Sequence, residues 1–110
     1  MADKYLKQRL IPASSTETAL YTVPAANVAI AKSLRVTNAN ASSADITVKQ
    51  YDADGGTAVF LLKESALAAD ATVEVFLGVP LVLEELNVLK VTATQSDVSF
   101  YLSYLEVDRN

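Results

Sequence analysis

A two-residue alternation of apolar side chains between residues 21 and 52 constrains the fold more than any other feature. Side chains that alternate in this way belong to strands that bury one face. A small polar loop separates two such stretches, 28–38 and 46–51, so we expect neighbouring strands that direct one parity inward. The inward residues expected are Val28, Ile30, Leu34 and Val36 in the first stretch and Ile46 and Val48 in the second.

Lys32 interrupts this pattern, because it occupies the inward parity of the first strand. Lysine is almost never buried without a partner. A β-bulge or a crossing between two sheets would release the side chain to solvent. We therefore predict an irregularity at Lys32 rather than a buried functional lysine.

Eight short segments with strand patterns, separated by polar turns, predict an antiparallel β-sandwich. Residues 63–71 favour one helical turn or a loop that crosses between sheets. In the fifth segment, 72–77, Val73, Val75 and Leu77 are expected inward and Glu74 outward. The expected strands are 18–23, 28–38, 46–51, 58–62, 72–77, 81–83, 88–93 and 98–107.

Two similar halves favour a jelly roll, which is built from two Greek keys. Leu34-Arg-Val-Thr37 and Leu89-Lys-Val-Thr92 each follow a Val-Pro pair and precede a loop and a strand. The predicted fold is thus an all-β, jelly-roll-like sandwich of about eight strands over residues 16–110. Residues 1–15 are predicted to be a basic N-terminal arm and linker, and residues 3–11 within them fit either a strand or an extended arm.

Composition excludes several classes of function. The 110 residues carry a net charge of −4, so non-specific binding to nucleic acid is not expected. The first residues lack the apolar segment of a secretory signal, and no apolar run approaches the ~20 residues of a membrane helix. We therefore expect synthesis in a cytosol and no membrane partner.

The residue types needed for chemistry are scarce. The chain contains no cysteine and no histidine, which removes the usual nucleophile, general base and metal ligands. Asp52-Ala-Asp-Gly-Gly56 fits a hairpin turn better than a calcium loop, because the closing glutamate and flanking helices are missing. We predict no enzyme, no catalytic residues, no cofactor and no metal site.

Two features instead predict an interaction surface. Lys4, Lys7 and Arg9 give the first ten residues a basic character, whereas the rest of the chain is acidic. The last strand is apolar on both parities, as expected for a strand that is either central in a sandwich or covered by another subunit. The predicted interface residues are Lys4, Lys7, Arg9, Tyr101, Leu105 and Val107.

Several segments resemble small virion structural proteins of tailed bacteriophages, namely head-decoration (cement) and tail-associated β-sandwich modules. The resemblance extends over residues 16–107. Such proteins often carry a glycine in the turn before the penultimate strand, where this chain has Glu85-Leu-Asn87. The segments are Leu20-Tyr-Thr-Val-Pro24, Ala29-Ile-Ala-Lys-Ser-Leu-Arg-Val-Thr-Asn38, Pro80-Leu-Val-Leu83 and Leu89-Lys-Val-Thr92.

The resemblance implies a non-enzymatic, multi-copy part of a virion. The leading expectation is a capsid decoration protein that binds and stabilises the head. Its partners would be itself, as a homo-oligomer with a trimer favoured, and the major capsid protein or another virion protein. The alternative is a tail, baseplate or fibre module that binds a receptor or carbohydrate, with Tyr21, Tyr51 or Tyr101 as stacking platforms.

Overall fold

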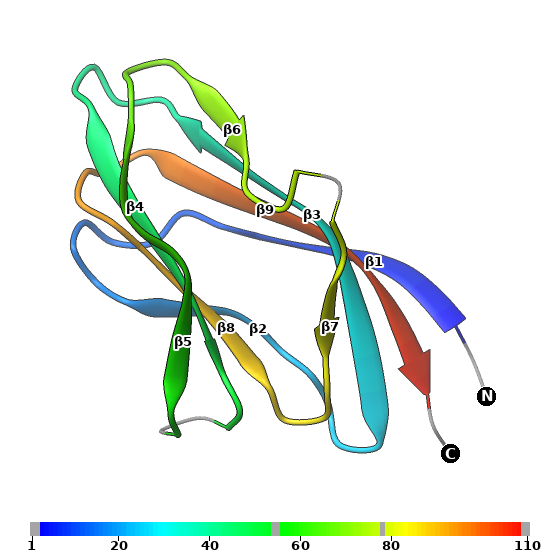
Figure 1. Ribbon diagram of the computed structural model, residues 1–110. Helices are drawn as coiled ribbons and strands as arrows, with labels where there is room; N and C mark the ends of the chain where they lie inside the picture. The colour runs from blue at the N-terminus through cyan, green and yellow to red at the C-terminus, as the bar shows by residue number, and fades with distance from the viewer. Residues whose placement is uncertain (1–2, 54–55, 78, 109–110) are drawn as a thin grey trace.

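A computed structural model describes residues 3–53, 56–77 and 79–108 and places nine strands in two antiparallel sheets (Figure 1). Sheet A has the order β1-β9-β3, with β6 and β7 both paired to β3, and sheet B has the order β2-β8-β4-β5. The strands are β1 (Asp3–Leu10), β2 (Thr18–Thr22), β3 (Asn27–Asn38), β4 (Ala44–Tyr51), β5 (Ala58–Leu67), β6 (Thr72–Glu74), β7 (Leu81–Leu83), β8 (Val88–Ala93) and β9 (Val98–Asp108).

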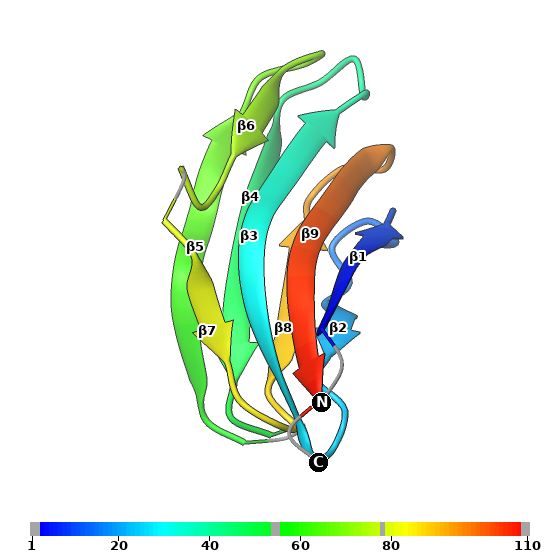
Figure 2. The same ribbon diagram turned by 90° about the vertical axis from the view of Figure 1, so that its right-hand side faces the viewer.

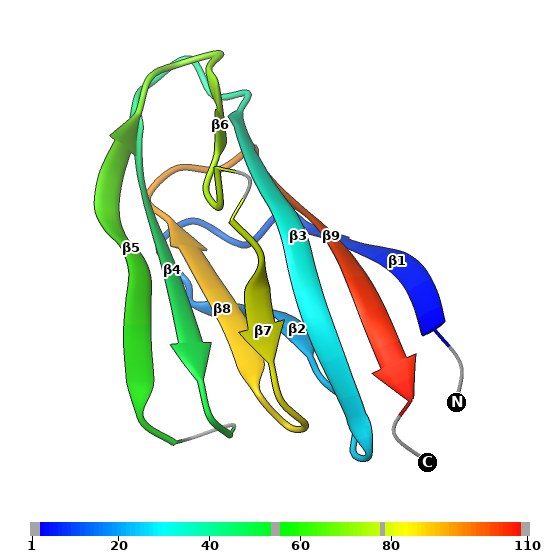
Figure 3. The ribbon, with the colours of Figure 1, turned by 45° about the vertical axis from the view of Figure 1, so that its right-hand side comes forward.

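This strand order is that of a jelly roll. Strands β6 and β7 pair with different parts of β3 and act as one interrupted strand, which gives four strands in each sheet. Figure 2 shows sheet A in front of sheet B, and Figure 3 shows both layers at an oblique angle. The predicted all-β, jelly-roll-like sandwich is confirmed.

The core lies between the sheets and consists of the inward parity of each long strand. In β9 the buried residues alternate strictly from Val98 to Tyr104, in β4 they do so from Ala44 to Val48, and in β8 they do so from Leu89 to Ala93. Each large apolar side chain buried in this way contributes about 1.5–3 kcal/mol. The largest fully buried side chains include Phe100, Leu34, Ile46, Leu83, Leu89 and Leu102.

The bulge predicted at Lys32 is confirmed, and it overturns part of the predicted facing of β3. The pairing of β3 with β9 shifts between Ala31 and Ser33, and Lys32 is exposed. One extra residue reverses the parity, so Ala29 and Ala31 are inward before the bulge and Leu34 and Val36 after it. The expectation that Val28 and Ile30 point inward is therefore wrong, since both lie on the outer side.

Glu74 explains why β6 and β7 are separate strands. Its carboxylate accepts hydrogen bonds from the Ser33 hydroxyl, from the Leu34 backbone N–H at 2.9 Å and from the Phe76 N–H at 3.1 Å. The side chain thus replaces strand pairing next to the bulge. The predicted strand 72–77 ends at Glu74 for this reason, and Phe76 is buried where Leu77 was expected.

Residues 63–71 do not form a helical turn. Strand β5 continues to Leu67, and Glu64 has a positive φ of 46° where the β4–β5 register shifts. The Glu64 N–H donates to the Thr47 hydroxyl at 3.1 Å, which compensates the irregularity. Pairing with β4 therefore overrides the local helical preference of this segment.

Residues 3–10 form a strand rather than an arm. All eight residues of β1 pair in unbroken register with β9, from Asp3 opposite Val107 to Leu10 opposite Phe100. The basic segment is thus an edge strand of sheet A. The boundary predicted at residue 15 falls in the loop after β1, and a separate 16–110 unit stays a prediction.

Candidate interaction surface

The outer side of sheet A brings together aromatic, apolar and basic side chains from β1, β9 and β3. Residues directly opposite each other in an antiparallel pair share a face, so the register fixes the arrangement. Three rows result, and we call this surface the A face. The rows are Tyr5, Leu105 and Ile30; Lys7, Ser103 and Ser33; and Arg9, Tyr101 and Arg35.

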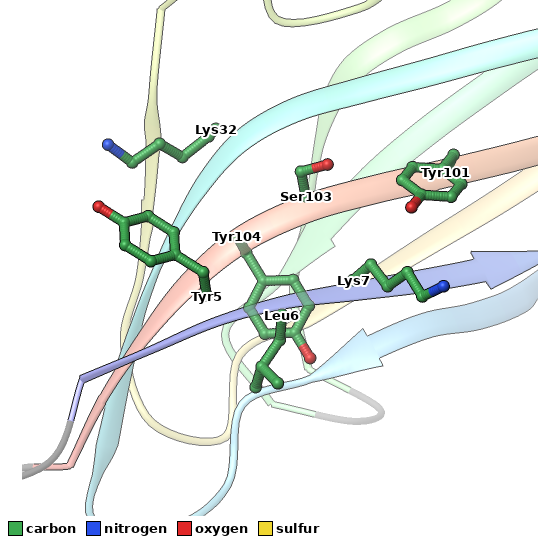
Figure 4. Close-up of a pocket in the computed structure, with 7 residues that line it drawn as sticks. All are labelled: Tyr5, Leu6, Lys7, Lys32, Tyr101, Ser103 and Tyr104. Carbon is green, nitrogen blue, oxygen red and sulfur yellow. The ribbon is translucent and has the colours of Figure 1, made fainter.

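The middle row forms an open groove of about 780 Å³, because its serines are smaller than the side chains on either side (Figure 4). Tyr5, which is 78% exposed, and Tyr101, which is 39% exposed, lie at the two ends. The groove is lined by Tyr5, Leu6, Lys7, Lys32, Tyr101, Ser103 and Tyr104.

Cations on the A face lack acidic partners within the described part of the chain. Among those residues, Lys7, Arg9 and Arg35 form no ion pair. Lys32 lies with its ammonium 6.0 Å from the centre of the Tyr5 ring, a distance at the limit of a cation–π contact. Glu74 lies opposite Arg35, but its carboxylate accepts hydrogen bonds from Ser33, Leu34 and Phe76. The face thus combines exposed apolar area with cations that form no ion pair among the described residues.

The outer side of sheet B, the B face, differs in that it carries an ion pair within the chain. The Lys49 ammonium lies 3.1 Å from the Glu17 carboxylate, which also accepts a 3.0 Å hydrogen bond from the Tyr51 hydroxyl. Lys49 and Lys63 each lie 5.0 Å from the Phe60 ring, and the Lys90 ammonium lies 4.8 Å from the Tyr51 ring.

Electrostatics at Glu17 reflect this pairing. Burial raises the pKa of this carboxyl, but hydrogen bonds from Lys49 and Tyr51 lower it, as do the charges of Lys49 and Lys90. The net effect is a pKa below the usual value of glutamate. The carboxylate is therefore stabilised in its charged form.

A polar cluster links the two sheets beside β1 and β2. The Tyr21 hydroxyl of sheet B donates to the Glu106 carboxylate of sheet A at 2.7 Å, and Asn27 Nδ2 donates to the same carboxylate at 2.9 Å. The ring centres of Tyr21 and Tyr104 are 4.3 Å apart. Burial raises the pKa of both tyrosines. At Tyr21 the hydrogen bond to Glu106 and the Glu106 charge raise the pKa further, whereas at Tyr104 a hydrogen bond from Gln8 opposes the shift and the Glu106 charge adds to it.

The structure places five of the six predicted interface residues on the A face. Lys7 and Arg9 lie beside Ser103 and Tyr101, and Leu105 and Val107 follow on the same side of β9. Lys4 lies on the opposite parity, opposite Glu106. The role of these residues in an interface stays a prediction.

Sequence reasoning missed Tyr5, Ile30 and Arg35 as members of this surface. Residues 4–9 are exposed on both sides of the edge strand, so the sequence carries no burial pattern there. Ile30 was assigned to the core because the prediction did not allow for the reversal of inward and outward positions that the bulge at Lys32 causes. Arg35 was missed because its position beside Tyr101 depends on the register between β3 and β9, which the sequence does not reveal.

Of the three tyrosines considered as sugar platforms, only Tyr101 is exposed. Tyr21 is buried against Tyr104, and Tyr51 is covered by Lys90 and bonded to Glu17.

The described ranges contain no group of acidic side chains placed to hold a metal ion. The hairpin turn predicted at Asp52-Ala-Asp-Gly-Gly56 falls partly on residues 54 and 55, outside the described residues. Within the same ranges, no helix has the length and apolar character that crossing a membrane requires.

No protein-family model and no curated protein sequence matches this chain. Among solved structures, the fold is similar to a chain of the Bacillus endospore appendages, described as disulfide-linked pili. That match has a TM-score of 0.62 at 11% identity and covers 99% of this chain and 88% of the other.

Two viral proteins also share the fold. A chain of the T13 particle of infectious bursal disease virus matches with a TM-score of 0.58 at 10% identity, over 94% of this chain. A chain of the Gx strain of the same virus matches with a TM-score of 0.53 at 12% identity, over 96% of this chain. In both cases this chain spans 30% of the viral protein. These similarities establish a common jelly-roll fold.

Proposed function

We propose that this chain is a non-enzymatic structural subunit of a multi-copy assembly and that the A face is its contact surface. The observation that carries the proposal is the contrast between the faces. On the B face Lys49 is paired with Glu17, whereas on the A face Lys7 and Arg9 lie beside exposed tyrosines and form no ion pair among the described residues. Tyrosine and arginine are enriched where protein interfaces derive their binding energy.

In the finer form of the proposal, the assembly is a virion and the chain is a capsid decoration (cement) protein. The resemblance of its strand and turn segments to phage decoration proteins supports this form. The jelly-roll fold, shared with proteins of an icosahedral viral particle, is compatible with it. The proposed partners are further copies of the chain and the major capsid protein or another virion protein.

Two alternatives keep a specific observation in their favour. Tyr101 and Tyr5 are exposed on one face, as a tail or fibre module that stacks on a sugar would require. The similarity to an endospore appendage subunit covers nearly the whole of both chains and favours a filament. A filament of this chain would be held without disulfides, because the sequence has no cysteine.

Quantitative mass spectrometry of purified phage particles tests the proposal. We expect a copy number comparable to that of the major capsid protein for a decoration protein. A few copies per particle would place the chain in the tail. Absence from particles, together with filaments in electron micrographs of the producing cells, would replace the virion by an appendage.

A second experiment concerns oligomeric state. We expect light scattering to report a homo-oligomer, a trimer in the favoured form, and binding to particles to weaken when residues 1–10 are deleted. That deletion removes β1 and with it Lys7 and Arg9 of the A face. A wild-type monomer at high concentration, with a truncated protein that still binds particles normally, would contradict both expectations.

A further inference from the structure

The turn between β7 and β8 presents an exposed leucine in an unfavourable conformation. Leu86 is 51% exposed and has a φ of 65°, in the left-handed region. A residue with a Cβ is disfavoured there, and glycine is the residue that adopts it without strain. Neither solvent exposure nor backbone conformation therefore favours a leucine at this position within the isolated chain.

Hydrogen bonds hold this turn rigidly from several directions. Within the turn, Asn87 Oδ1 accepts from the Glu84 N–H at 2.9 Å, while Asn87 Nδ2 donates to the Asp52 carbonyl at 2.9 Å. The Leu86 N–H donates to the Val23 carbonyl at 2.9 Å, and Glu85 Oε2 accepts from the Ala26 N–H at 2.6 Å. The turn is thus a fixed protrusion that carries one leucine and the exposed side chains of Glu84 and Glu85.

The groove on the A face has the complementary chemistry. Its aromatic ends, Tyr5 and Tyr101, offer apolar surface, and Lys7 and Lys32 supply two exposed positive charges. A leucine accompanied by two carboxylates would bury its apolar side chain between the rings and place its charges beside the lysines. The turn lies at the lower end of the molecule in Figure 1, away from the β1–β9 pair that forms the groove, and its residues are not part of the groove lining.

We propose that the A-face groove receives the acidic turn of residues 84–86 from a second copy of this chain. This inference rests on the proposed function, because it names the partner of that same face. The turn and the groove are different surfaces, so the contact is heterologous. Contacts of this type build closed rings or open filaments rather than face-to-face dimers.

The decisive variant is Leu86→Gly, studied in the full-length chain. Glycine removes the protruding side chain and also relieves the positive φ, so we expect a higher melting temperature together with at least tenfold weaker self-association in analytical ultracentrifugation. If Leu86 had a purely structural role, its replacement would not raise the melting temperature while weakening self-association. Increased stability with unchanged association would overturn the proposal.

Leu77→Gly is the matched control, because Leu77 is also exposed, has a φ of 51° and is a leucine. Its sequence neighbours carry no carboxylate. We expect the same rise in melting temperature and no change in association. Equal weakening by both variants would contradict the assignment to the β7–β8 turn.

Charge exchange between the two surfaces provides an independent test. We expect Lys7→Glu and Glu84→Lys to weaken self-association separately and a mixture of the two proteins to restore it, with a stronger dependence on salt than in either variant alone. Association of Glu84→Lys at the wild-type level would indicate face-to-face packing and overturn the proposal. A chain that is abundant in purified particles but monomeric in solution at every concentration would overturn the self-contact alone, whereas absence from every assembly would overturn the proposed function as well.

Discussion

The two outer faces of the sandwich share a backbone architecture but differ in how their charges are paired. On the B face, Glu17 links Lys49 and Tyr51, and lysines of the same chain lie over the rings of Tyr51 and Phe60, although Phe60 remains 47% exposed. On the A face, Arg9 and Arg35 lie in register on either side of Tyr101. Within the described residues neither forms an ion pair, although Glu74 lies opposite Arg35 on β6.

Under the proposed function, this difference predicts that the A face makes the contacts between subunits. A surface whose charges are neutralised within the chain gains little from a partner, because docking would first break existing interactions. A surface with exposed rings and uncompensated charge gains both apolar burial and charge pairing on docking. Oligomerisation should therefore depend on the A face and tolerate changes on the B face.

Leu105→Asp should break this comparison most strongly. Leu105 lies between Tyr5 and Ile30 in the apolar row, and a carboxylate there would have to be desolvated in any contact. We expect association to weaken by about 2–4 kcal/mol, the range of interface hot spots. Light scattering across a concentration series measures the effect.

Thr92→Asp is the control on the opposite surface, since Thr92 lies on the B face opposite Thr47. It should leave the association constant unchanged while circular dichroism confirms that both variants are folded. Similar losses for the two variants would mean that the faces do not differ in function.

The sequence predicted the sandwich and the bulge at Lys32, because both follow from local alternation. It did not predict the consequence of the bulge, since nothing in the sequence states whether the irregularity adds an odd number of residues. A single inserted residue sends Ile30 outward and Ala31 inward. Strand β5 was underestimated for a related reason: its bulge at Glu64 is compensated by the Thr47 hydroxyl of another strand.

The A face could be predicted only in part. The pairs Lys7 with Ser103 and Arg9 with Tyr101 join residues more than ninety positions apart, and their register depends on packing of the whole sheet. Tyr5 gave no signal because an edge strand exposed on both sides shows no alternation. The apolar outward parity of β9 was visible in the sequence, and it correctly placed Leu105 and Val107 on one face.

Tyr21→Phe sharpens the comparison, because this side chain ties the sheet behind the B face to the sheet behind the A face. The variant leaves Glu106 with the Asn27 amide as its remaining described hydrogen-bond donor. A hydrogen bond to a charged group contributes about 1.5–3 kcal/mol, so we expect a loss of stability of that order in urea denaturation. Association measured below the unfolding transition should remain close to that of the wild type, and a large change would show that the A face depends on this linkage.

Alkaline pH probes the same linkage without a mutation. Burial raises the pKa of Tyr21 and Tyr104 in the folded protein. Their contribution to the free energy of unfolding is therefore complete below the unfolded pKa of about 10 and is lost as pH rises through the folded pKa. Each tyrosine ionised only in the unfolded state costs up to about 1.4 kcal/mol by one pH unit above 10. Lysines also titrate in this pH range, so the effect of Tyr21 is the difference between the wild type and Tyr21→Phe in how stability changes with pH. Identical slopes of stability against pH for the two proteins would contradict this assignment.

Glu17→Gln against Lys7→Gln gives the smallest effect and the most direct comparison of the faces. The pKa of Glu17 is lowered in the folded state. Its contribution to the free energy of unfolding is therefore complete above the unfolded pKa of about 4.3 and disappears as pH falls through the folded pKa. Partly exposed ion pairs are screened by solvent, so we expect Glu17→Gln to cost about 0.5 kcal/mol near neutral pH and nothing in strong acid. Lys7→Gln should change folding stability by less than that, because Lys7 has no ion-pair partner among the described residues. Urea denaturation at pH 7 and pH 3 measures both variants, and an equal or larger cost for Lys7→Gln would show that the A face is as internally paired as the B face.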